Sequence, residues 1–337
     1  MIMRGLTLVA ALTLAVVAPA QAADDFFAGK TIRIYTGGGV GGTSGMAAHL
    51  MAEHLPRFLP GAQAIPQFME GAGGTRAIDY VANAAPRDGT VWGIALPTAL
   101  TTPLLYPQQV KYDPRKLIWL GSLIGYTSVI SVLDTAPARS IDAAKTTELI
   151  IGATGVGSPA YQEPAIVKAV LGAKFKIVTG YKGGSEVTLA MERGEVHGRA
   201  MVTNGWEAQA PHWVKGNRLV HLVQLGPGDP KRMPTVPRLI DLAPDDKKPI
   251  VRFYEAAPRA GWAVFLPPDV PAERVAVIRK AYAALVADPK FIADIADKAK
   301  ADVLDLRGAA FQRIVEDVMA TPGPIVAEVR KIYGEGK

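Results

Sequence analysis

The chain has 337 residues, with 37 Lys and Arg against 31 Asp and Glu and a formal net charge of +6 at pH 7. These charges are scattered, and no basic run is interleaved with aromatic residues, so we expect no nucleic-acid partner. The absence of cysteine excludes disulfides, thiol nucleophiles, thiolate metal sites and lipid attachment through a cysteine. Without disulfides the protein must be stabilised by its core, and a chain of this length is expected to form two domains.

The N-terminus has the pattern of a secretory signal peptide. Arg4 supplies a positive charge, residues 6–17 are apolar, and Ala20 and Ala22 form a small-x-small cleavage site. The apolar run is shorter than the ~20 residues that a membrane-spanning helix needs. We therefore expect residues 1–22 to be a signal peptide cleaved after Ala22, which places the mature protein outside the cytoplasm.

A β-rich run at residues 30–36 leads into a glycine loop at residues 37–45, and an alanine-rich segment at residues 46–55 follows with helical character. A strand, a glycine turn and a helix N-terminus in this order present unpaired backbone N–H groups and the positive end of a helix dipole. The sequence therefore predicts an anion-binding loop. A structural turn without a ligand remains an alternative.

The same loop matches the dinucleotide-binding pattern GxGxxG through Gly37, Gly39 and Gly42, which alone is a weak signal. That pattern also requires an acidic residue about 20 positions further on, and Glu70 comes late for this role. An exported protein would in addition lack a supply of nicotinamide cofactor. We therefore expect no cofactor.

Two further strands are predicted in the first half of the chain, at residues 64–69 and 90–95. The first runs into a second glycine turn at residues 70–74 and a helix at residues 75–84, and the second runs into a loop at residues 96–100. Ligands of open α/β sheets lie at the carboxyl ends of the strands. We therefore expect the three loops to share one rim that faces a ligand.

The second half repeats this alternation and predicts a second α/β unit. Residues 119–133 are interpreted as a crossing from one unit to the other, and residues 260–266 as the last strand and the return crossing. We predict the remaining elements, in chain order, as a strand at 148–153, a helix at 160–171, a strand at 174–179, a helix from Ser185 as N-cap to near Gly194, strands at 197–202 and 219–225, and helices from 272, at 309–319 and at 325–333. The helix from 272 has an apolar stripe formed by Val275, Ile278, Tyr282, Leu285 and Val286.

The sequence contains no recognisable catalytic or metal-binding motif. None of the five histidines forms an HExxH pair, and there is no GxSxG motif for a serine nucleophile. The loops instead contain small residues and hydroxyls, whose N–H and O–H groups suit a carboxylate. Lys182, in a glycine turn, is interpreted either as a ligand contact or as a surface charge. We expect no catalysis and no metal; an exported α/β enzyme of hydrolase type acting on a small anion remains the alternative.

The glycine loop and five later segments, in their order and spacing, resemble the Bug family, the periplasmic solute receptors of tripartite tricarboxylate transporters. The later segments are Gly-Ala-Gly-Gly at 71–74, Ala-Pro-Arg-Asp-Gly-Thr at 85–90, Tyr-Asp-Pro at 112–114, Gly-Tyr-Lys-Gly-Gly at 180–184 and Leu-Pro-Pro-Asp-Val-Pro at 266–271. The resemblance spans essentially the whole mature chain, although no single segment is diagnostic.

The resemblance implies a type II periplasmic-binding-protein fold, with two α/β lobes joined by two crossing segments and a ligand cleft between them. Lobe 1 would comprise residues 23–125 and 256–337, and lobe 2 residues 126–255. The resemblance also implies a periplasmic, non-enzymatic receptor that closes on a small carboxylate. Its partners would be membrane transporter subunits or a sensor protein, and we expect a monomer.

In such receptors the glycine loop after the first strand and a loop of the second lobe each hold a carboxylate, largely through main-chain groups and ordered water. Carried over to this chain, the expected ligand-binding residues are Gly38, Gly39, Val40, Gly41, Gly42, Thr43, Ser44, Thr98, Thr154, Gly157, Ser158, Tyr181, Thr203 and Asn204. The family loop commonly continues with Asp and, four residues later, Arg. Gly45 and His49 stand at these positions here, so the charged junction of loop and helix is altered.

Overall fold

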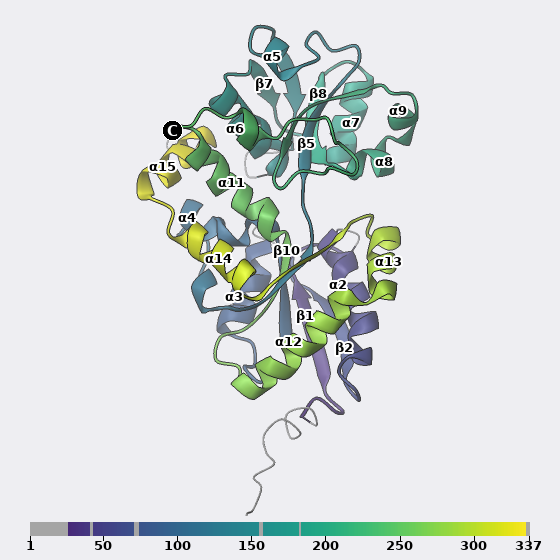
Figure 1. Cartoon of the computed structure of the whole chain (residues 1–337), viewed down its shortest axis with the longest axis vertical. Coiled ribbons are helices and arrows are strands. Elements are labelled where there is room, and N and C mark those ends of the chain that lie inside the picture. Colours follow the sequence, from purple (N-terminus) through teal and green to yellow (C-terminus); the bar gives the residue numbers. More distant parts are fainter. Residues whose placement is uncertain (1–25, 41–42, 71–73, 155–157, 182, 335–337) are drawn as a thin grey trace, which may run out of the picture.

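The described residues of the computed structural model are 26–40, 43–70, 74–154, 158–181 and 183–334. The expected signal peptide and its cleavage site after Ala22 lie outside them. The described chain forms two lobes stacked along the long axis of the molecule, each with a β-sheet and helices packed against it (Figure 1). This arrangement confirms the expected α/β class and the two lobes. No helix in the described ranges is both long and apolar enough to cross a membrane.

Within the described residues, the sheet of lobe 1 has six strands in the order β11-β4-β10-β3-β1-β2. Their bounds are β1 Thr31–Thr36, β2 Gln63–Phe68, β3 Val91–Ala95, β4 Ile118–Ile124, β10 Trp262–Leu266 and β11 Val303–Arg307. β1 pairs in parallel with both β2 and β3, whereas β10 runs antiparallel between β3 and β4. Because β1, β2 and β3 are parallel, their carboxyl ends meet at one edge of the sheet.

Helices cover both faces of this sheet. One face packs against α3 and α14, and the other against α2, α12 and α13. The helical segments of this part of the chain are α2 Thr43–His54, η1 Leu55–Arg57, α3 Thr75–Asn83, η3 Pro97–Leu100, α4 Thr102–Leu105, η4 Pro114–Lys116, α12 Ala272–Ala287, α13 Pro289–Lys298, α14 Gly308–Met319 and α15 Gly323–Ile332. The predicted apolar stripe of α12 is buried along its whole length, which confirms it.

The sheet of lobe 2, as far as the chain is described, has five strands in the order β7-β6-β8-β5-β9. The elements are β5 Ser128–Leu133, α5 Ile141–Ala144, β6 Leu149–Gly152, α6 Pro159–Leu171, β7 Phe175–Val178, α7 Gly184–Glu192, β8 Gly198–Val202, α8 Gly205–Gln209, α9 Pro211–Lys215, β9 Leu219–Leu225, α10 Leu239–Leu242 and α11 Lys248–Ala260. β6 pairs in parallel with β7 and β8, so the carboxyl ends of these three strands also share one edge.

The sequence analysis did not anticipate α11, α13 and β11, nor the short helices α4, α5, α8, α9 and α10. α11 carries one proline at its start and Pro258 in its last turn, and prolines argue against a helix when the sequence is read alone. The N-cap prediction for Ser185 is wrong. α7 begins at Gly184, with Gly183 at the cap position, and the Arg199 guanidinium lies beside Gly184 and donates to its carbonyl oxygen.

The two sheets are connected twice. Residues 125–127 lead from β4 to β5, and α11 returns to β10, lying between the lobes (Figure 1). The Gly125 N–H donates to the Asp302 carbonyl oxygen of lobe 1 (3.1 Å), and the Thr203 N–H of lobe 2 donates to the Thr127 carbonyl oxygen (3.0 Å). The first crossing is therefore fixed to one lobe at its beginning and to the other at its end.

α11 also holds a buried acid, Glu255, whose side chain is only 7% exposed and accepts the Gly226 N–H at 3.4 Å. Burial raises the pKa of Glu255 from its usual 4.5 to about 7. Between these two pH values the folded protein keeps a proton that the unfolded chain has released. The free energy of unfolding contributed by this group therefore falls as the pH rises from about 4.5 to about 7.

We predict that Glu255→Gln removes this fall. One pKa unit corresponds to ~1.36 kcal/mol, so the difference in unfolding free energy between variant and wild type should increase by about 3 kcal/mol from pH 4 to pH 8. Urea unfolding followed by circular dichroism across this range measures it. Glu207→Gln, at an exposed position, is the control and should follow the wild-type profile. Parallel profiles for wild type and Glu255→Gln would contradict the prediction.

Candidate functional site

The loops after β1, β2 and β3 are in contact at the edge of the lobe 1 sheet. A side chain at Gly37 would collide with the backbone of Gly74, and a side chain at Gly74 would collide with Leu96. Gly74 has a φ of 88°, a conformation that favours glycine. These contacts join the first glycine loop, the second glycine turn and the loop after β3, which confirms the predicted common rim. Of the second turn, residues 71–73 lie outside the described residues.

The described part of the first loop is held closely against the start of α2. The Gly38 N–H donates to Thr36 Oγ1 at 3.3 Å, and a side chain at Gly38 would collide with the Ser44 hydroxyl. Beside Gly39, Glu70 Oε1 lies 3.0 Å from the position that a Cβ would take. Val40 is 55% exposed. Two of the predicted ligand residues of this loop, at positions 41 and 42, lie outside the described residues.

The structure gives a steric reason for the altered family pattern at the loop-helix junction. Gly45 is buried, and a side chain there would collide with the carbonyl oxygen of Gly39 and lie 2.7 Å from that of Val40. An aspartate would not fit unless these carbonyls moved. His49 is exposed and its ring lies 5.4 Å from the ring of Phe68 on β2. At this junction Gly45 packs against the loop backbone and His49 contacts Phe68, where the family pattern has an aspartate and an arginine.

On lobe 2 the loops after β6 and β7 also meet. The Gly180 N–H donates to the Thr154 carbonyl oxygen at 3.2 Å, and the Tyr181 ring lies 3.5 Å from the position that a Cβ would take at Gly152. Ser158 occupies the N-cap position of α6. Gly157 and Lys182 lie outside the described residues.

Two predicted residues follow β8. Asn204 stands at the N-cap position of α8 and is half-buried. The buried Thr203 donates its hydroxyl proton to Asp229 Oδ2 at 2.6 Å and its N–H to Thr127. Both of its donors are therefore used inside the protein.

A cavity of about 300 Å³ lies between the lobes, beside the loop after β3 in lobe 1 and the start of α6 in lobe 2. Its walls are formed by Leu96, Pro97, Thr98, Thr101, Leu105, Tyr126, Pro159, Gln162, Phe253, Tyr254, Ala257, Pro258, Trp262 and Tyr333. Thr98 is among the predicted ligand residues. The others were missed because they come from both lobes, both crossings and the C-terminal end of the chain, and no local spacing connects them.

A buried carboxylate, Glu163 on α6, lies behind two tyrosines of the cavity wall. Tyr126 and Ser128 donate their hydroxyl protons to it, and the Tyr254 hydroxyl donates at 2.9 Å. Burial raises the pKa of Glu163, although these three hydroxyls and Arg199 oppose the rise. Since Tyr126 belongs to the first crossing and Tyr254 to α11, this group, which we call the Glu163 cluster, joins both crossings to lobe 2.

An ion pair also connects the lobes beside the first crossing. Arg232, after β9, lies 2.8 Å from Asp302 of lobe 1 and 3.2 Å from Asp229. Asp229 in turn accepts the Thr203 hydroxyl. The rim of lobe 2 is thereby linked to lobe 1 through three side chains.

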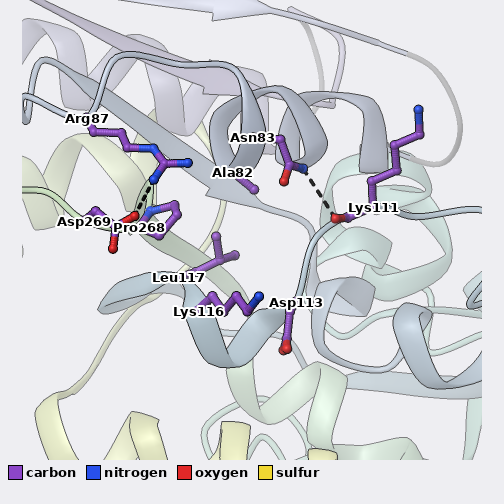
Figure 2. A pocket seen from close by; sticks show the side chains of 9 residues that line it. All are labelled: Ala82, Asn83, Arg87, Lys111, Asp113, Lys116, Leu117, Pro268 and Asp269. Carbon is purple, nitrogen blue, oxygen red and sulfur yellow. Dashed lines mark hydrogen bonds and ion pairs between the residues drawn. The ribbon is translucent and has the colours of Figure 1, made fainter.

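A second, larger hollow of about 550 Å³ lies at the opposite edge of the lobe 1 sheet. It is lined by residues near the start of β3 and β4 and the end of β10, and Figure 2 shows Arg87 directed toward Asp269 and Asn83 directed toward the backbone of Lys111. The amino ends of parallel strands are not where open α/β sheets hold ligands. We therefore place the candidate site in the cavity between the lobes.

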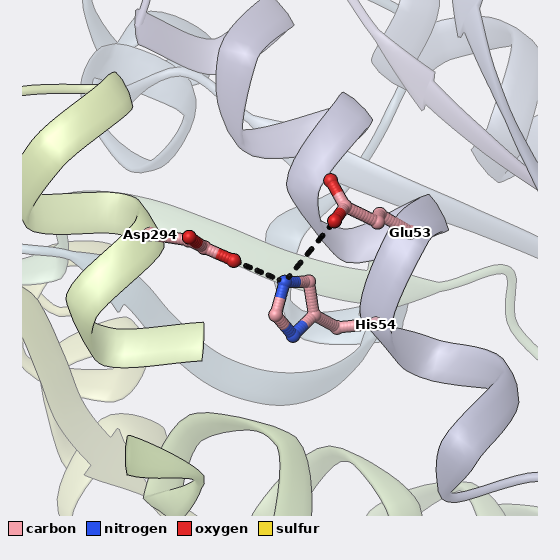
Figure 3. A group of neighbouring side chains, drawn as sticks. All are labelled: Glu53, His54 and Asp294. Atoms are coloured by element: carbon pink, nitrogen blue, oxygen red, sulfur yellow. Dashed lines mark hydrogen bonds and ion pairs between the residues drawn. The ribbon is translucent and has the colours of Figure 1, made fainter. Parts of the chain in front are cut away.

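One group of side chains has the composition of a metal site. His54 lies between Asp294 and Glu53, with its Nε2 2.7 Å from Asp294 Oδ2 (Figure 3). Its Nδ1 accepts a hydrogen bond from Arg57 at 2.7 Å, so Nε2 carries the proton that is donated to Asp294. Lys298 also lies 3.6 Å from Glu53. Both ring nitrogens of His54 are therefore used in hydrogen bonds within the protein, one to Asp294 and one to Arg57. These contacts connect α2 to α13.

Two α/β lobes, with a cavity between them at the carboxyl ends of parallel strands, define a receptor of the periplasmic-binding-protein class. A family model described as the tripartite tricarboxylate transporter family receptor matches residues 49–330. The chain therefore belongs to this receptor family, as the resemblance of its motifs indicated. The family consists of periplasmic solute-binding receptors of membrane transporters.

Similar proteins agree with this assignment. The UPF0065 protein in the gbd 5' region of Cupriavidus necator is 29% identical over 231 residues, which cover 66% of this chain and 68% of that protein. A TctC solute-binding protein from Polaromonas has a TM-score of 0.70 and 18% identity, covering 91% of this chain and 98% of its own. MatC from Rhodopseudomonas palustris, solved with bound malate, has a TM-score of 0.63 and 18% identity, covering 88% and 99%. These structures confirm the predicted periplasmic-binding-protein fold.

We predict that removing one hydroxyl from the Glu163 cluster destabilises the protein. Tyr126→Phe keeps the ring, which lies 5.8 Å from that of Trp262, but leaves the buried carboxylate with one donor fewer. The free energy of unfolding should fall by about 1–3 kcal/mol, the usual effect of an unsatisfied buried polar group. Chemical denaturation measures it.

The matched control for this variant is Tyr161→Phe on α6. The Tyr161 hydroxyl makes no hydrogen bond with any described residue, so its removal should change the stability by less than about 0.5 kcal/mol. Equal stabilities of Tyr126→Phe and the wild type would show that the cluster does not hold the crossings.

Proposed function

We propose that this protein is an extracytoplasmic solute receptor that captures a small organic carboxylate between its lobes and delivers it to a membrane transporter. The observation that carries the proposal is the cavity between the lobes, which lies beside the loop that follows β3 in one sheet and the helix α6 that follows β6 in the other. Backbone N–H groups at such strand ends bind anions without a cationic side chain. The malate bound to MatC is a ligand of this kind in a protein of the same fold.

We further propose that the ligand carboxylate contacts the glycine loop of lobe 1 and the loop after β6 of lobe 2. The close packing of Gly38 against Ser44, and of Gly180 against Thr154, supports rims made of backbone. The remaining predicted contacts stay part of this proposal, including those at positions 41, 42 and 157. Both donors of Thr203 are occupied inside the protein, so this residue would act by holding the rim of lobe 2 in place.

We propose that the protein has no catalytic activity. Among the described residues, Ser131 Oγ and His221 Nδ1 are 2.7 Å apart and resemble a nucleophile and its base. Ser131 is completely buried on β5, so no substrate reaches it. Burial also lowers the pKa of His221, and no carboxylate of the described chain orients its ring. These features argue against the alternative of an exported hydrolase.

The remaining proposals concern the cellular setting. We propose that the chain is exported with cleavage after Ala22, that it works as a monomer in the periplasm, and that its partners are the membrane subunits of a transporter. A sensor protein is the second candidate partner. Co-purification of the mature protein with membrane subunits encoded by neighbouring genes would distinguish the two.

We predict that a thermal-shift screen of the mature chain against small carboxylic acids detects the ligand. A ligand present at about 100 times its Kd adds about 2.7 kcal/mol to the free energy of unfolding, which moves the melting temperature by several degrees. A melting temperature that no acid raises would contradict the receptor proposal.

The glycine loop provides a second prediction. Gly38→Val should weaken binding of the acid found in the screen by at least tenfold, because the new side chain would displace Ser44 and the loop with it. Titration calorimetry measures the affinity, and circular dichroism shows whether the fold survives. Ile292→Ala, at an exposed position of α13 outside the predicted contacts, is the control and should change the affinity by less than threefold. Wild-type affinity in Gly38→Val would mean that this loop is only structural.

A further inference from the structure

The cavity between the lobes has predominantly apolar walls. Leu96 and Leu105 come from lobe 1, Phe253 and Pro258 from α11, and Trp262 from the start of β10. Trp262 is partly exposed, and its ring meets the Tyr126 ring edge to face at 5.8 Å. Such walls favour an apolar group, because they cannot replace the hydrogen bonds that a polar group makes with water.

Several polar groups of these walls are already engaged within the protein. The hydroxyls of Tyr126 and Tyr254 donate to Glu163, and the hydroxyl of Thr101 donates to the Thr98 carbonyl oxygen at 3.2 Å. The two tyrosines therefore contribute mainly their ring surfaces to the cavity. A polar substituent placed there would lose water and find few free donors.

The charges around the cavity disfavour a second carboxylate. No Lys, Arg or His is found among its described lining residues. Glu163 lies behind the two tyrosines, and Glu70 lies beside Gly39 on the adjoining rim. A carboxylate inside the cavity would be removed from water, and no cationic side chain among the lining residues would serve as its counter-ion.

The volume of the cavity suits a single compact group. At ~30 Å³ for each water molecule in the liquid, its 300 Å³ would hold about ten waters. This is the lower end of the range for small-molecule sites. A six-membered ring fits in this space, with room left for the bonds that lead to a carboxylate at the rim.

We infer that the ligand is a monocarboxylate with an apolar body of about the size of a six-membered ring. The body lies against Trp262 inside the cavity, and the carboxylate points to the glycine rims of the two lobes. This inference rests on the proposed receptor function and narrows its ligand class. It separates this chain from MatC, whose bound malate has two carboxylates and a hydroxyl.

The test compares acids that share the carboxylate and differ in the body. Titration calorimetry of the mature protein should give an affinity for cyclohexanecarboxylate or benzoate at least tenfold higher than for malate or succinate. The heat capacity change should be negative, as expected when apolar surface is buried. If malate or succinate binds as tightly as the ring acids, the receptor function stands and this inference is wrong. If none of these acids and no other carboxylate binds, the receptor function itself fails.

Variants of Trp262 locate the apolar body. Trp262→Ala should weaken cyclohexanecarboxylate by at least tenfold and leave acetate, which has no body, within twofold of wild type. Trp262→Phe should restore most of the affinity for cyclohexanecarboxylate, leaving a loss of about threefold relative to wild type. If Trp262→Ala does not fold, this smaller loss provides the test. The control is Phe58→Ala, a partly exposed aromatic position of lobe 1 outside the cavity, which should not change either affinity. An equal loss for both acids, or for neither, in the Trp262 variants would overturn the inference.

Discussion

The two segments that cross between the lobes are both held to lobe 2 by one buried carboxylate. Glu163 belongs to lobe 2, yet two of its three hydroxyl donors, Tyr126 and Tyr254, come from the segments that run between the lobes. A buried acid is stable only while its partners are in place, because each lost hydrogen bond leaves a desolvated group. The two crossings therefore cannot separate from α6 without a large cost. A movement of the lobes that preserves these bonds must pivot beside this cluster.

The proposed ligand site lies next to the Glu163 cluster. It offers backbone groups and a shaped cavity for recognition, and few charged side chains. The rims consist of glycine loops packed so closely that side chains at Gly38, Gly45 or Gly74 would collide with their neighbours. Backbone N–H groups recognise a carboxylate but do not distinguish one acid from another. In the proposed mode of binding, discrimination falls to the cavity, whose walls include Trp262 and the rings of Tyr126 and Tyr254.

The features that follow from local pattern were predictable from the sequence. The strand, glycine turn and helix around Gly38 are contiguous, and the stripe on α12 follows the helical period, so both are found where they were expected. The cavity was not predictable, because Leu96, Gln162 and Tyr333 come together only through the tertiary fold. The hydroxyl of Thr203 is a similar case. Its partner Asp229 lies 26 positions further along the chain, and no motif connects the two.

The position of β10 has a consequence for how the chain reaches its folded state. This strand, residues 262–266, lies between β3 and β4 and is the hydrogen-bonded link between the two halves of the first sheet. Lobe 1 begins near the N-terminus, yet its sheet cannot be completed until these late residues are available. During synthesis and passage across a membrane, the early strands would stay without their central neighbour. The order of the strands thus delays completion of the lobe 1 sheet until residues 262–266 have emerged, which would suit the proposed export of an unfolded chain.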